Sequence, residues 1–476
     1  MGLLRPFSLK TQNSSSRLAC LVAISSSLCL IYLFASVALV HTPKFVKFSS
    51  TQAVSAPTNI EHIVFGIATS QGSWERSKEY VKLWWRPQMR GCVFTESPPP
   101  KNTASLNDTS ANSLPPVCIS EDTARFPYTY RNGPRSAIRV ARVVLETVAL
   151  NHSNVRWFVF GDDDTVFFPD NLAKTLSKYD HELWHYIGAN SESLMQMKLF
   201  SHDMAFGGGG FAISYPLAKV LAKVFDSCLE RYPHIYGRDG RVQACIAELG
   251  IELTREPGFH QVDLRGDIFG LLAAHPNSLL LSLHHLDRTH PIFPNMTSTK
   301  AAAHLFDAAK LDPHRLLQRT ICYDRWYSWT ISVSWGYAIQ VFPRHVFLPD
   351  VLRAQRTFDS WKKGHALGES FAFDTVEPHP NPCARPTVFF FDKAVSGRDG
   401  IRSSYRRMTP DNCTVDIGSP RKLEEIRVSS HKLDLGMKQL QAPRRHCCNV
   451  LPPSSGKLME IAIRECGEEE TIRMAR

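Results

Sequence analysis

Several common signatures are missing from this sequence of 476 residues. It has no phosphate-binding loop of the Walker type and no Gly-x-Gly-x-x-Gly fingerprint, so the familiar P-loop and dinucleotide sites are not indicated. It also has no Cys-x-x-Cys zinc pair and no helix-turn-helix, zinc-finger or RNA-binding signature. The formal net charge is +10 at pH 7, but the lysines and arginines are scattered. We therefore expect no nucleic acid partner, and the basic balance suits a membrane surface or a phosphorylated small molecule.

Charge is absent from residues 18–40, which are mostly apolar. At 1.5 Å per residue this run reaches about 35 Å, enough to span a hydrocarbon core about 30 Å thick. One interpretation is a transmembrane signal anchor behind a cytoplasmic tail of residues 1–17. The other is a signal peptide cleaved near Ser36-Val37-Ala38. We favour the anchor because the apolar run is long for a signal peptide, and both interpretations place the rest of the chain in the secretory lumen.

Glycosylation sequons and cysteines agree with a lumenal location. Ten of the twelve cysteines lie beyond residue 40, where an oxidising compartment favours disulfides over metal binding. The pairs we would test first are Cys92 with Cys118 and then Cys228 with Cys245, although connectivity does not follow from sequence alone. The Asn-x-Ser/Thr acceptor pattern begins at Asn107, Asn151, Asn295 and Asn412.

Three consecutive carboxylates, Asp162, Asp163 and Asp164, follow the apolar run 157–160 and precede the apolar residues 166–168. Adjacent negative charges between buried segments repel one another and resist desolvation, and a divalent cation removes both costs. Hard oxygen ligands suit Mg²⁺ or Mn²⁺, which also bind phosphate oxygens. The alternative is an acidic turn that caps the next helix. Residues 170–171 look like a separate helix start, which leaves the triplet free for a metal.

Two further stretches predict close approach to a ligand. Residues 60–67 read as a buried strand, and a small polar turn containing Thr69 leads into a basic helix over 75–85 that carries Arg76. Strand, turn and helix in this order begin nucleotide sites in α/β sheets, or form an ordinary βα unit. The run Gly207–Gly210 would let a ligand approach the backbone, or would be a flexible turn.

Asp239 and the pair His284-His285 are the remaining candidates. Asp239 precedes an apolar helical face, where it would be either an N-terminal cap or a base that projects into a cleft. The histidines follow the hydrophobic strand predicted over 279–283. Because neighbouring strand residues point to opposite faces, only one of the two should enter the cleft.

The expected organisation is an α/β domain followed by an aromatic, β-rich extension. Residues 41–59 read as a stem, 60–290 as the α/β domain, 291–408 as the extension and 409–476 as a polar, cysteine-containing segment. The amphipathic helix predicted over 136–151 has Arg135, Arg139 and Arg142 along it. These arginines would face either a phosphate or solvent, and we expect at least two of them on an exposed face.

In this order, the motifs resemble those of the Fringe-like inverting β-1,3-glycosyltransferases, and most closely a plant branch with a C-terminal region of unknown function. The resemblance covers roughly residues 60–287 and continues through 323–342 and 389–393. It is carried by Ile63–Ile67, by Trp157–Asp164, by Gly207–Phe211, by Asp239 ahead of Ala-Glu-Leu-Gly, and by Ser282–His285.

The resemblance implies a single-pass type II Golgi membrane protein with a GT-A fold, which is a Rossmann-like mixed sheet, over residues 60–290. It implies a nucleotide-sugar donor, UDP-galactose or UDP-N-acetylglucosamine, and a glycan acceptor. Such an enzyme transfers a hexose or N-acetylhexosamine with inversion. The donor sugar and the acceptor are not distinguished by the sequence. The rival expectations are a non-catalytic lumenal sugar-binding relative and a structural membrane protein.

The resemblance also assigns roles to residues. Asp164 would hold Mn²⁺, or Mg²⁺, with His284 as the second ligand and His285 as the fallback. Asp239 matches the catalytic base. Many relatives have two adjacent acids there, whereas here Arg238 precedes and Gly240 follows. The donor would lie against Thr69, Arg76, Asp162, Asp163, Gly208 and Gly209.

Overall fold

The structure is a computed structural model that describes residues 14–40, 56–98, 113–362, 370–408, 412–416, 418–452 and 456–474. The chain forms two compact units, Met1–Ala56 and Pro57–Arg476. The first contains helix α1 (Ser14–Val40). A search of the described residues finds no helix that meets the length and apolarity needed to cross a membrane. The anchor expected over 18–40 therefore stays a prediction.

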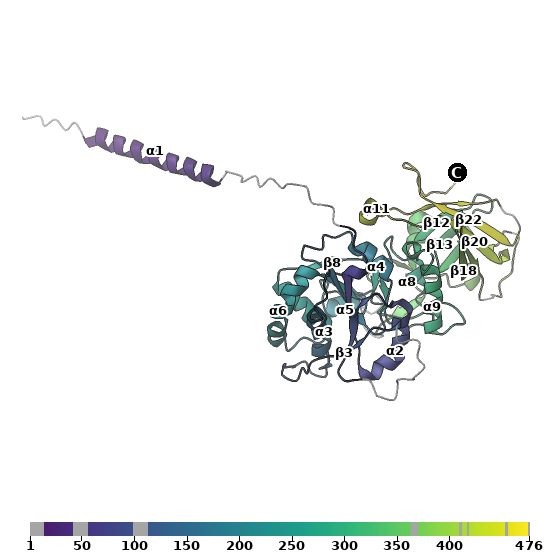
Figure 1. The fold of residues 1–476 in the computed structure, drawn as a ribbon. Coiled ribbons are helices and arrows are strands. Elements are labelled where there is room, and N and C mark those ends of the chain that lie inside the picture. The colour runs from purple at the N-terminus through teal and green to yellow at the C-terminus, as the bar shows by residue number, and fades with distance from the viewer. Residues whose placement is uncertain are drawn as a thin grey trace, which may run out of the picture. The chain divides into compact units, whose positions relative to one another are not determined.

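A mixed sheet forms the centre of the first half of the second unit (Figure 1). Among the described residues it has seven strands in the order β3-β2-β1-β4-β7-β6-β8. Strands β3, β2, β1 and β4 are parallel, whereas β7 runs antiparallel to both β4 and β6. The predicted α/β class with a mixed sheet is confirmed. The strands are β1 (Ile63–Ala68), β2 (Arg90–Thr95), β3 (Val117–Ile119), β4 (Trp157–Asp162), β6 (Tyr186–Gly188), β7 (Phe211–Ser214) and β8 (Leu253–Arg255).

Both faces of this sheet are covered, which explains why β1 is apolar along its whole length. Ile63, Phe65 and Ile67 pack in one hydrophobic cluster with Trp84 of α2, whereas Val64 packs with Ile138 in another. Alternate strand residues point to opposite faces, so a strand buried on both sides reads as a continuous hydrophobic run.

Helices α3, α6 and α7 pack against one another over the second face. The disulfide Cys228–Cys245 joins α6 to α7, and Cys92–Cys118 joins β2 to the segment β3. Both predicted pairs are confirmed. The helices beyond α1 are α2 (Gln71–Trp84), α3 (Ala137–Ala149), α4 (Pro169–Leu176), α5 (Leu194–Leu199), α6 (Tyr215–Arg231), α7 (Arg238–Glu248), α8 (Phe269–Ala273), α9 (Ser298–Ala309), α10 (Leu348–Leu352) and α11 (Met437–Gln441).

The expectation for the arginines near α3 was wrong, because two of the three are buried rather than exposed. Arg142 is 1% exposed and forms ion pairs of 2.8 Å with both Asp226 and Glu121. Arg139 donates to the carbonyl oxygen of Thr69 at 2.7 Å. The partners come from segments that are distant in the sequence, so the helical pattern alone did not show them.

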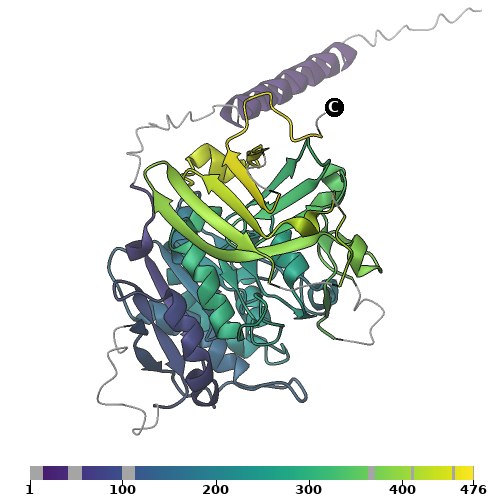
Figure 2. The ribbon, with the colours of Figure 1, turned by 90° about the vertical axis from the view of Figure 1, so that its right-hand side faces the viewer.

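A second, larger sheet occupies the C-terminal half (Figure 2). In the part of the chain that the structure describes it has eight strands in the order β12-β13-β14-β18-β19-β20-β22-β21. Strands occur throughout the region expected to be a β-rich extension, and three strands from the polar, cysteine-containing segment 409–476 complete the same sheet. Its strands are β12 (Arg319–Tyr323), β13 (Thr330–Ser334), β14 (Ala338–Phe342), β18 (Thr387–Gly397), β19 (Gly400–Arg406), β20 (Glu425–Ser430), β21 (Cys447–Val450) and β22 (Leu458–Arg464).

The two sheets share one hydrophobic core. A single cluster of buried residues runs from Ile63 on β1 to Ile463 on β22, and the rings of Phe168 and Phe306 stack at 4.9 Å within it. The aromatic residues of the extension are mainly core, as Trp329 and Trp335 show. The disulfides Cys322–Cys448, Cys383–Cys413 and Cys447–Cys466 fasten the extension. Short strands complete the fold: β5 (Val166–Phe167), β9 (Phe259–His260), β10 (Leu264–Gly266), β11 (Ser282–Leu283), β15 (Ala354–Gln355), β16 (Phe358–Ser360) and β17 (Thr375–Val376).

Candidate functional site

The acidic triplet lies where the central strand β4 ends. Asp162 is the last residue of β4 and pairs in register with Ala68 at the end of β1. The turn that follows is held by Thr165, whose hydroxyl accepts the amide of Asp162 at 2.7 Å and donates to the carbonyl of Gly208 at 2.7 Å. Ligands of α/β sheets bind beyond the carboxyl ends of the strands, so the triplet occupies such a position.

Asp163 points to the neighbouring βα turn. The hydroxyl of Thr69 donates to its carboxylate at 2.6 Å. Burial raises the pKa of Asp163 to about 6, although that hydrogen bond favours the charged form. Thr69 and Asp163, both predicted to contact the nucleotide-sugar donor, therefore lie side by side, and Thr69 is bonded to the triplet itself. The side chain of Arg76 is exposed on α2, and within the described residues no hydrogen bond or ion pair joins it to the triplet.

Asp164 meets both histidines, which come from the end of β11. The Nε2 atom of His284 lies 3.0 Å from a carboxylate oxygen of Asp164. Asp164, His284 and His285 each offer one ligand atom, and these atoms lie within 4.8 Å of one another.

The expectation that only one histidine would enter the cleft was wrong. Strand β11 ends at Leu283, and His285 adopts a left-handed backbone with φ of 54°. The alternation of a strand therefore stops before the pair, and the two rings lie 3.7 Å apart. The extended conformation assumed from the hydrophobic run 279–283 covers only its last two residues.

Charge distinguishes the two imidazoles. Burial alone would lower the pKa of His284, but the carboxylate of Asp164 outweighs it and raises the pKa to about 9. Burial, followed by the charge on His284, lowers the pKa of His285 to about 3. Although burial opposes it, contact with His284 holds the pKa of Asp164 well below its usual range. A divalent cation here would replace the proton of His284, since an imidazole ligand must be neutral.

A second contact fixes the ring of His284. Its Nδ1 atom lies 3.2 Å from the carbonyl oxygen of Gln261, so that nitrogen carries the donated proton and Nε2 faces Asp164. This is the usual support for a metal-binding histidine, because the outer hydrogen bond orients the ring and selects the tautomer.

The glycine run is packed against these side chains and is not a flexible loop. A Cβ on Gly208 would lie 2.2 Å from the His284 ring, and one on Gly207 would lie 2.3 Å from a carboxylate oxygen of Asp239. The amide of Gly209 donates to the side chain of Gln261 at 2.6 Å. Only glycine, which has no side chain, allows His284, a candidate metal ligand, and Asp239, the candidate base, to lie this close to one turn.

Asp239 lies in the first turn of α7 but does not cap it. The N-cap residue is Gly237, with no side-chain hydrogen bond to the helix end. The Nε atom of Arg238 donates to Asp239 at 2.9 Å, and both terminal nitrogens of Arg238 bond the carboxylate of Asp162, one of them at 2.7 Å. Arg238 therefore ties the candidate base to the triplet. The side chain of Asp239 stays 23% exposed, so a ligand can reach it.

Three residues of the site were missed by the sequence prediction besides Arg238. Asp263 is buried, accepts a hydrogen bond from Ser191 at 2.6 Å and lies 3.6 Å from His285; burial raises its pKa to about 7. Trp361 stacks on His285 at 4.6 Å. Val262 has φ of 53°, which is rare for a β-branched residue and marks a strained backbone.

The sequence carries little signal for these contacts. Asp263 and Trp361 lie outside any motif, and Trp361 belongs to the extension. The positive φ of Val262 is held by Glu192, whose carboxylate accepts its amide at 2.7 Å.

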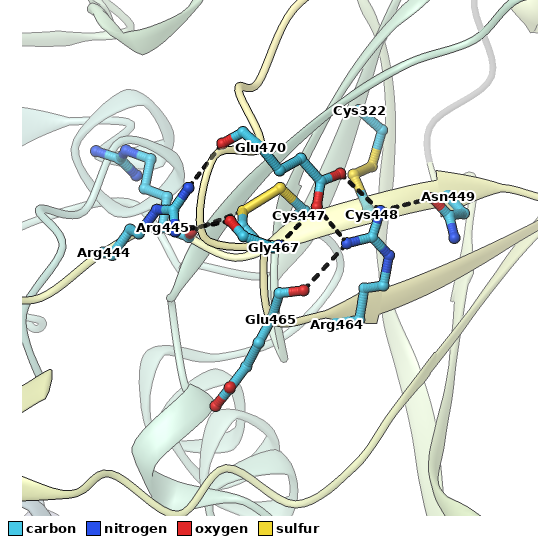
Figure 3. The surroundings of a disulfide bond; sticks show 11 residues. Cys322, Arg444, Arg445, Cys447, Cys448, Asn449, Arg464, Glu465, Gly467 and Glu470 are labelled. Atoms are coloured by element: carbon cyan, nitrogen blue, oxygen red, sulfur yellow. Dashed lines mark hydrogen bonds and ion pairs between the residues drawn. A yellow bond between two sulfur atoms is a disulfide. The ribbon is translucent and has the colours of Figure 1, made fainter.

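One carboxylate oxygen and two imidazole nitrogens suit a first-row divalent cation such as Mn²⁺. The side chain of Asp164 is 19% exposed, which leaves room for a further ligand from solution. A second grouping, Cys447, Cys466 and Glu470, is not a metal site, because its two sulfur atoms bond each other (Figure 3).

Comparison with known families gives one match. The profile of a family described as "Protein of unknown function, DUF604" matches residues 196–448, more than half of the chain. That range includes the glycine run, Asp239 and both histidines but begins after the acidic triplet. No curated protein matches the chain.

Proposed function

The chain belongs to the DUF604 family, and on that premise we propose that it is an inverting glycosyltransferase that uses a UDP-sugar and a divalent cation. The donor would be UDP-galactose or UDP-N-acetylglucosamine, and the acceptor a glycan hydroxyl, with a β-1,3 linkage. The proposal places the enzyme in the Golgi lumen behind a single-pass type II anchor.

The observation that carries the proposal is the convergence of four distant segments on one point. The end of β4, the glycine run, the start of α7 and the end of β11 bring together the acidic triplet, Gly208, Asp239 and the histidine pair. The resemblance described above assigned roles to these same residues. A set of titratable groups with mutually shifted pKa values at the carboxyl end of a central strand is also a good candidate site on physical grounds.

Asp164, His284 and His285 would hold Mn²⁺ or Mg²⁺. A cation bound there would neutralise the charge that develops on the departing diphosphate. Thr69 and Asp163, joined at 2.6 Å, would border the donor next to the end of β1. Gly208 and Gly209, which the resemblance assigns to the donor site, would contribute to it through their main chain.

Asp239 would act as the base. It accepts the proton of the acceptor hydroxyl while that oxygen bonds the anomeric carbon and the bond from this carbon to UDP breaks on the opposite face. Arg238 holds one oxygen of Asp239 at 2.9 Å, which leaves the other oxygen for the acceptor.

The lumenal location is supported by the cysteines and the sequons. Five disulfides join cysteines of the described residues, as is usual in oxidising compartments. The sequon residues Asn151, Asn295 and Asn412 are exposed, whereas Asn107 lies outside the described residues.

A second candidate, a non-catalytic lumenal relative that binds UDP-sugars or glycans, is favoured by one observation. Arg238 bonds both Asp162 and Asp239, so the two carboxylates are partly neutralised by the protein itself. Such a protein would bind UDP with Mn²⁺ and would not transfer the sugar.

The test measures Mn²⁺-dependent UDP release by the full-length protein with a panel of UDP-sugars and glycan acceptors. We expect Asp164→Ala to abolish UDP release and UDP binding, and Asp239→Asn to abolish release but leave UDP binding intact. Asp399→Asn, at an exposed turn, controls for the loss of a carboxylate. Full activity in Asp239→Asn would refute the assignment of the base. Mn²⁺-dependent UDP binding without turnover on any donor would favour the second candidate.

A further inference from the structure

A large cavity lined by described residues shares no lining residue with the site above. Its volume is about 620 Å³, within the usual range for small-molecule sites. Its wall combines the end of α4, the segments 255–257 and 276–279, the start of β12 and residues 433–446. The cavity is thus formed jointly by the α/β half and the C-terminal sheet of one compact unit.

The wall of this cavity is strongly basic. Its only acidic residues are Glu256 and Glu465, against the basic residues Lys178, Arg255, Arg319, Arg444 and Arg445. Glu256 is already paired, because Lys178 and the hydroxyl of Tyr179 both bond its carboxylate. Arg255 lies 3.7 Å from Asp203, an acid outside the wall. Positive charge therefore remains on Arg319, Arg444 and Arg445, for which the described residues supply no ion pair.

Glu465 does not compensate the remaining arginines. Its carboxylate accepts a hydrogen bond from the side-chain amide of Gln439 at 3.1 Å, and Arg464 bonds only the main-chain carbonyl of Glu465. Figure 3 shows the Glu465 side chain extending away from the guanidinium of Arg464, which pairs with Glu470 instead.

Arg445 lines the cavity together with Arg319 and Arg444. It is half-buried, and its guanidinium donates to the carbonyl oxygen of Arg319 at 3.2 Å. Among the described residues no carboxylate lies within ion-pair distance of it. Burial lowers the pKa of Arg445, and no nearby acid opposes that shift. A guanidinium that is partly removed from water without a counter-charge is costly, and an anionic ligand would reduce the cost.

Two neighbours strengthen the positive potential around Arg445. Arg319 is 3% exposed and bonds only the hydroxyl of Ser332 and the carbonyls of Val351 and Leu352. Burial, and then the charge of Arg445, lower the pKa of Arg319 to about 9. Arg444 likewise bonds two carbonyl oxygens, those of Gly467 and Glu470 (Figure 3).

The wall also has an apolar part, beside polar residues such as Asn277 and Gln318, and this part would accept the body of an organic molecule. Leu279, Leu433, Leu435 and Leu440 line it together with Pro257 and Pro443. An apolar wall with a small number of charged groups is the usual composition of a small-ligand site.

We propose that this cavity binds a small organic anion and that Arg445 contacts its charged group. The ligand carries a carboxylate, sulfate or phosphate on a body that packs against the leucines, such as an acidic sugar. A planar guanidinium suits all three groups because it can donate two parallel hydrogen bonds. This site is independent of the proposed transfer reaction.

The test titrates the full-length protein, without UDP or Mn²⁺, with sodium glucuronate, glucose 6-sulfate and glucose 6-phosphate, using calorimetry at low salt. We expect at least one probe to bind, and we expect Arg445→Gln to lower the affinity for that probe about tenfold or more. Arg445→Lys should weaken it less, because the charge stays while the fork is lost. Arg402→Gln, at an exposed position on β19, should leave the affinity unchanged and controls for net charge. The probe that binds tightest identifies the anionic group.

Two results would overturn the proposal: no binding of any probe at about 10 mM, well above the millimolar dissociation constants of weak ligands, or equal affinities in wild type and Arg445→Gln. Misfolding would not explain a loss of affinity in Arg445→Gln, because this change removes an uncompensated charge from the folded protein. Arg445→Gln should melt at or above the wild-type temperature in the absence of probe.

Discussion

The α-carbon of Gly208 faces the imidazole of His284 so closely that no other residue type fits between them. The contact explains the glycine by packing and not by flexibility, since a Cβ would lie 2.2 to 2.7 Å from three ring atoms. The same applies to Gly207 beside Asp239. At the scale of single residues, the glycine run is therefore part of the support for the metal and base candidates.

Replacing Gly208 by alanine should displace the His284 ring. We expect Mn²⁺ affinity to fall about tenfold to hundredfold, as for other losses of support around metal ligands. Calorimetric titration with Mn²⁺ measures the effect. Gly72→Ala is the matched control, because a Cβ there meets no atom within 4 Å. Unchanged Mn²⁺ affinity in Gly208→Ala would mean that His284 does not bind the cation.

His275 gives a prediction of pH dependence away from the candidate metal site. Burial, and then the charge of His260, lower the pKa of His275 well below 6.5 in the folded chain. A group whose folded pKa is lowered stabilises the fold above its unfolded pKa, and this contribution is lost as pH falls below about 6.5. The loss is about 1.4 kcal/mol per pH unit until the folded pKa is reached.

The measurement is urea unfolding of wild type and His275→Asn at pH 7.5, 6.5 and 5.5. We expect the variant to lose less stability between pH 6.5 and 5.5, by roughly 1 kcal/mol, because it cannot take up that proton. His202→Asn, at an exposed position, controls for the loss of a histidine. Parallel pH profiles for wild type and His275→Asn would contradict the assignment.

At the scale of elements, α7 depends on α6 for its position. The helix is short, Arg238–Glu248, and carries Asp239 in its first turn. The disulfide Cys228–Cys245 fastens its middle to the buried end of α6. An isolated helix of this length is marginal in water, so tertiary contacts must hold it in place.

Removing this disulfide with Cys228→Ala and Cys245→Ala should lower the free energy of unfolding by about 2 to 4 kcal/mol. Because α7 carries Asp239, UDP release under the proposed function should fall as well. Denaturant unfolding and the release assay measure the two effects. Cys20→Ser, at a cysteine without a disulfide, is the control. Unfolding that is unaffected by the double change would show that packing alone positions α7.

At the scale of the whole molecule, the C-terminal sheet and the α/β half form one structure. The hydrophobic cluster from Ile63 to Ile463 crosses the boundary expected at residue 290. Trp361, from the C-terminal part, also stacks on His285 of the candidate site. The extension therefore belongs to the core that supports the site.

We expect residues 57–476 to unfold in one transition. Calorimetry should give a single peak whose enthalpy agrees with its van't Hoff value, because neither sheet can lose its partner without exposing the shared core. A fragment ending at residue 290 should be insoluble for the same reason. Two separated transitions, or a stable soluble fragment 57–290, would show instead that the halves are independent domains.

The sequence by itself determined what depends on local order. Continuous apolar runs specified the buried strands β1 and β4, and the spacing of apolar residues specified α3, because these patterns match the period of each element. The acidic triplet, the glycine run, Asp239 and both histidines were all identified as candidates, and two disulfide pairs were predicted correctly. The family profile and the sequence motifs indicate which residues could form a site, but they do not show how those residues contact one another.

Only the tertiary structure decided how those groups are arranged. The left-handed backbone at His285 placed both imidazoles beside Asp164, and Arg238 joined Asp162 to Asp239. Arg142 was buried because Asp226 and Glu121 lie beside it in space. The pattern of a single element cannot show such contacts, because each depends on partners that folding brings from distant parts of the chain. Likewise, the unpaired charge of Arg445 is visible only once every nearby acid has been located.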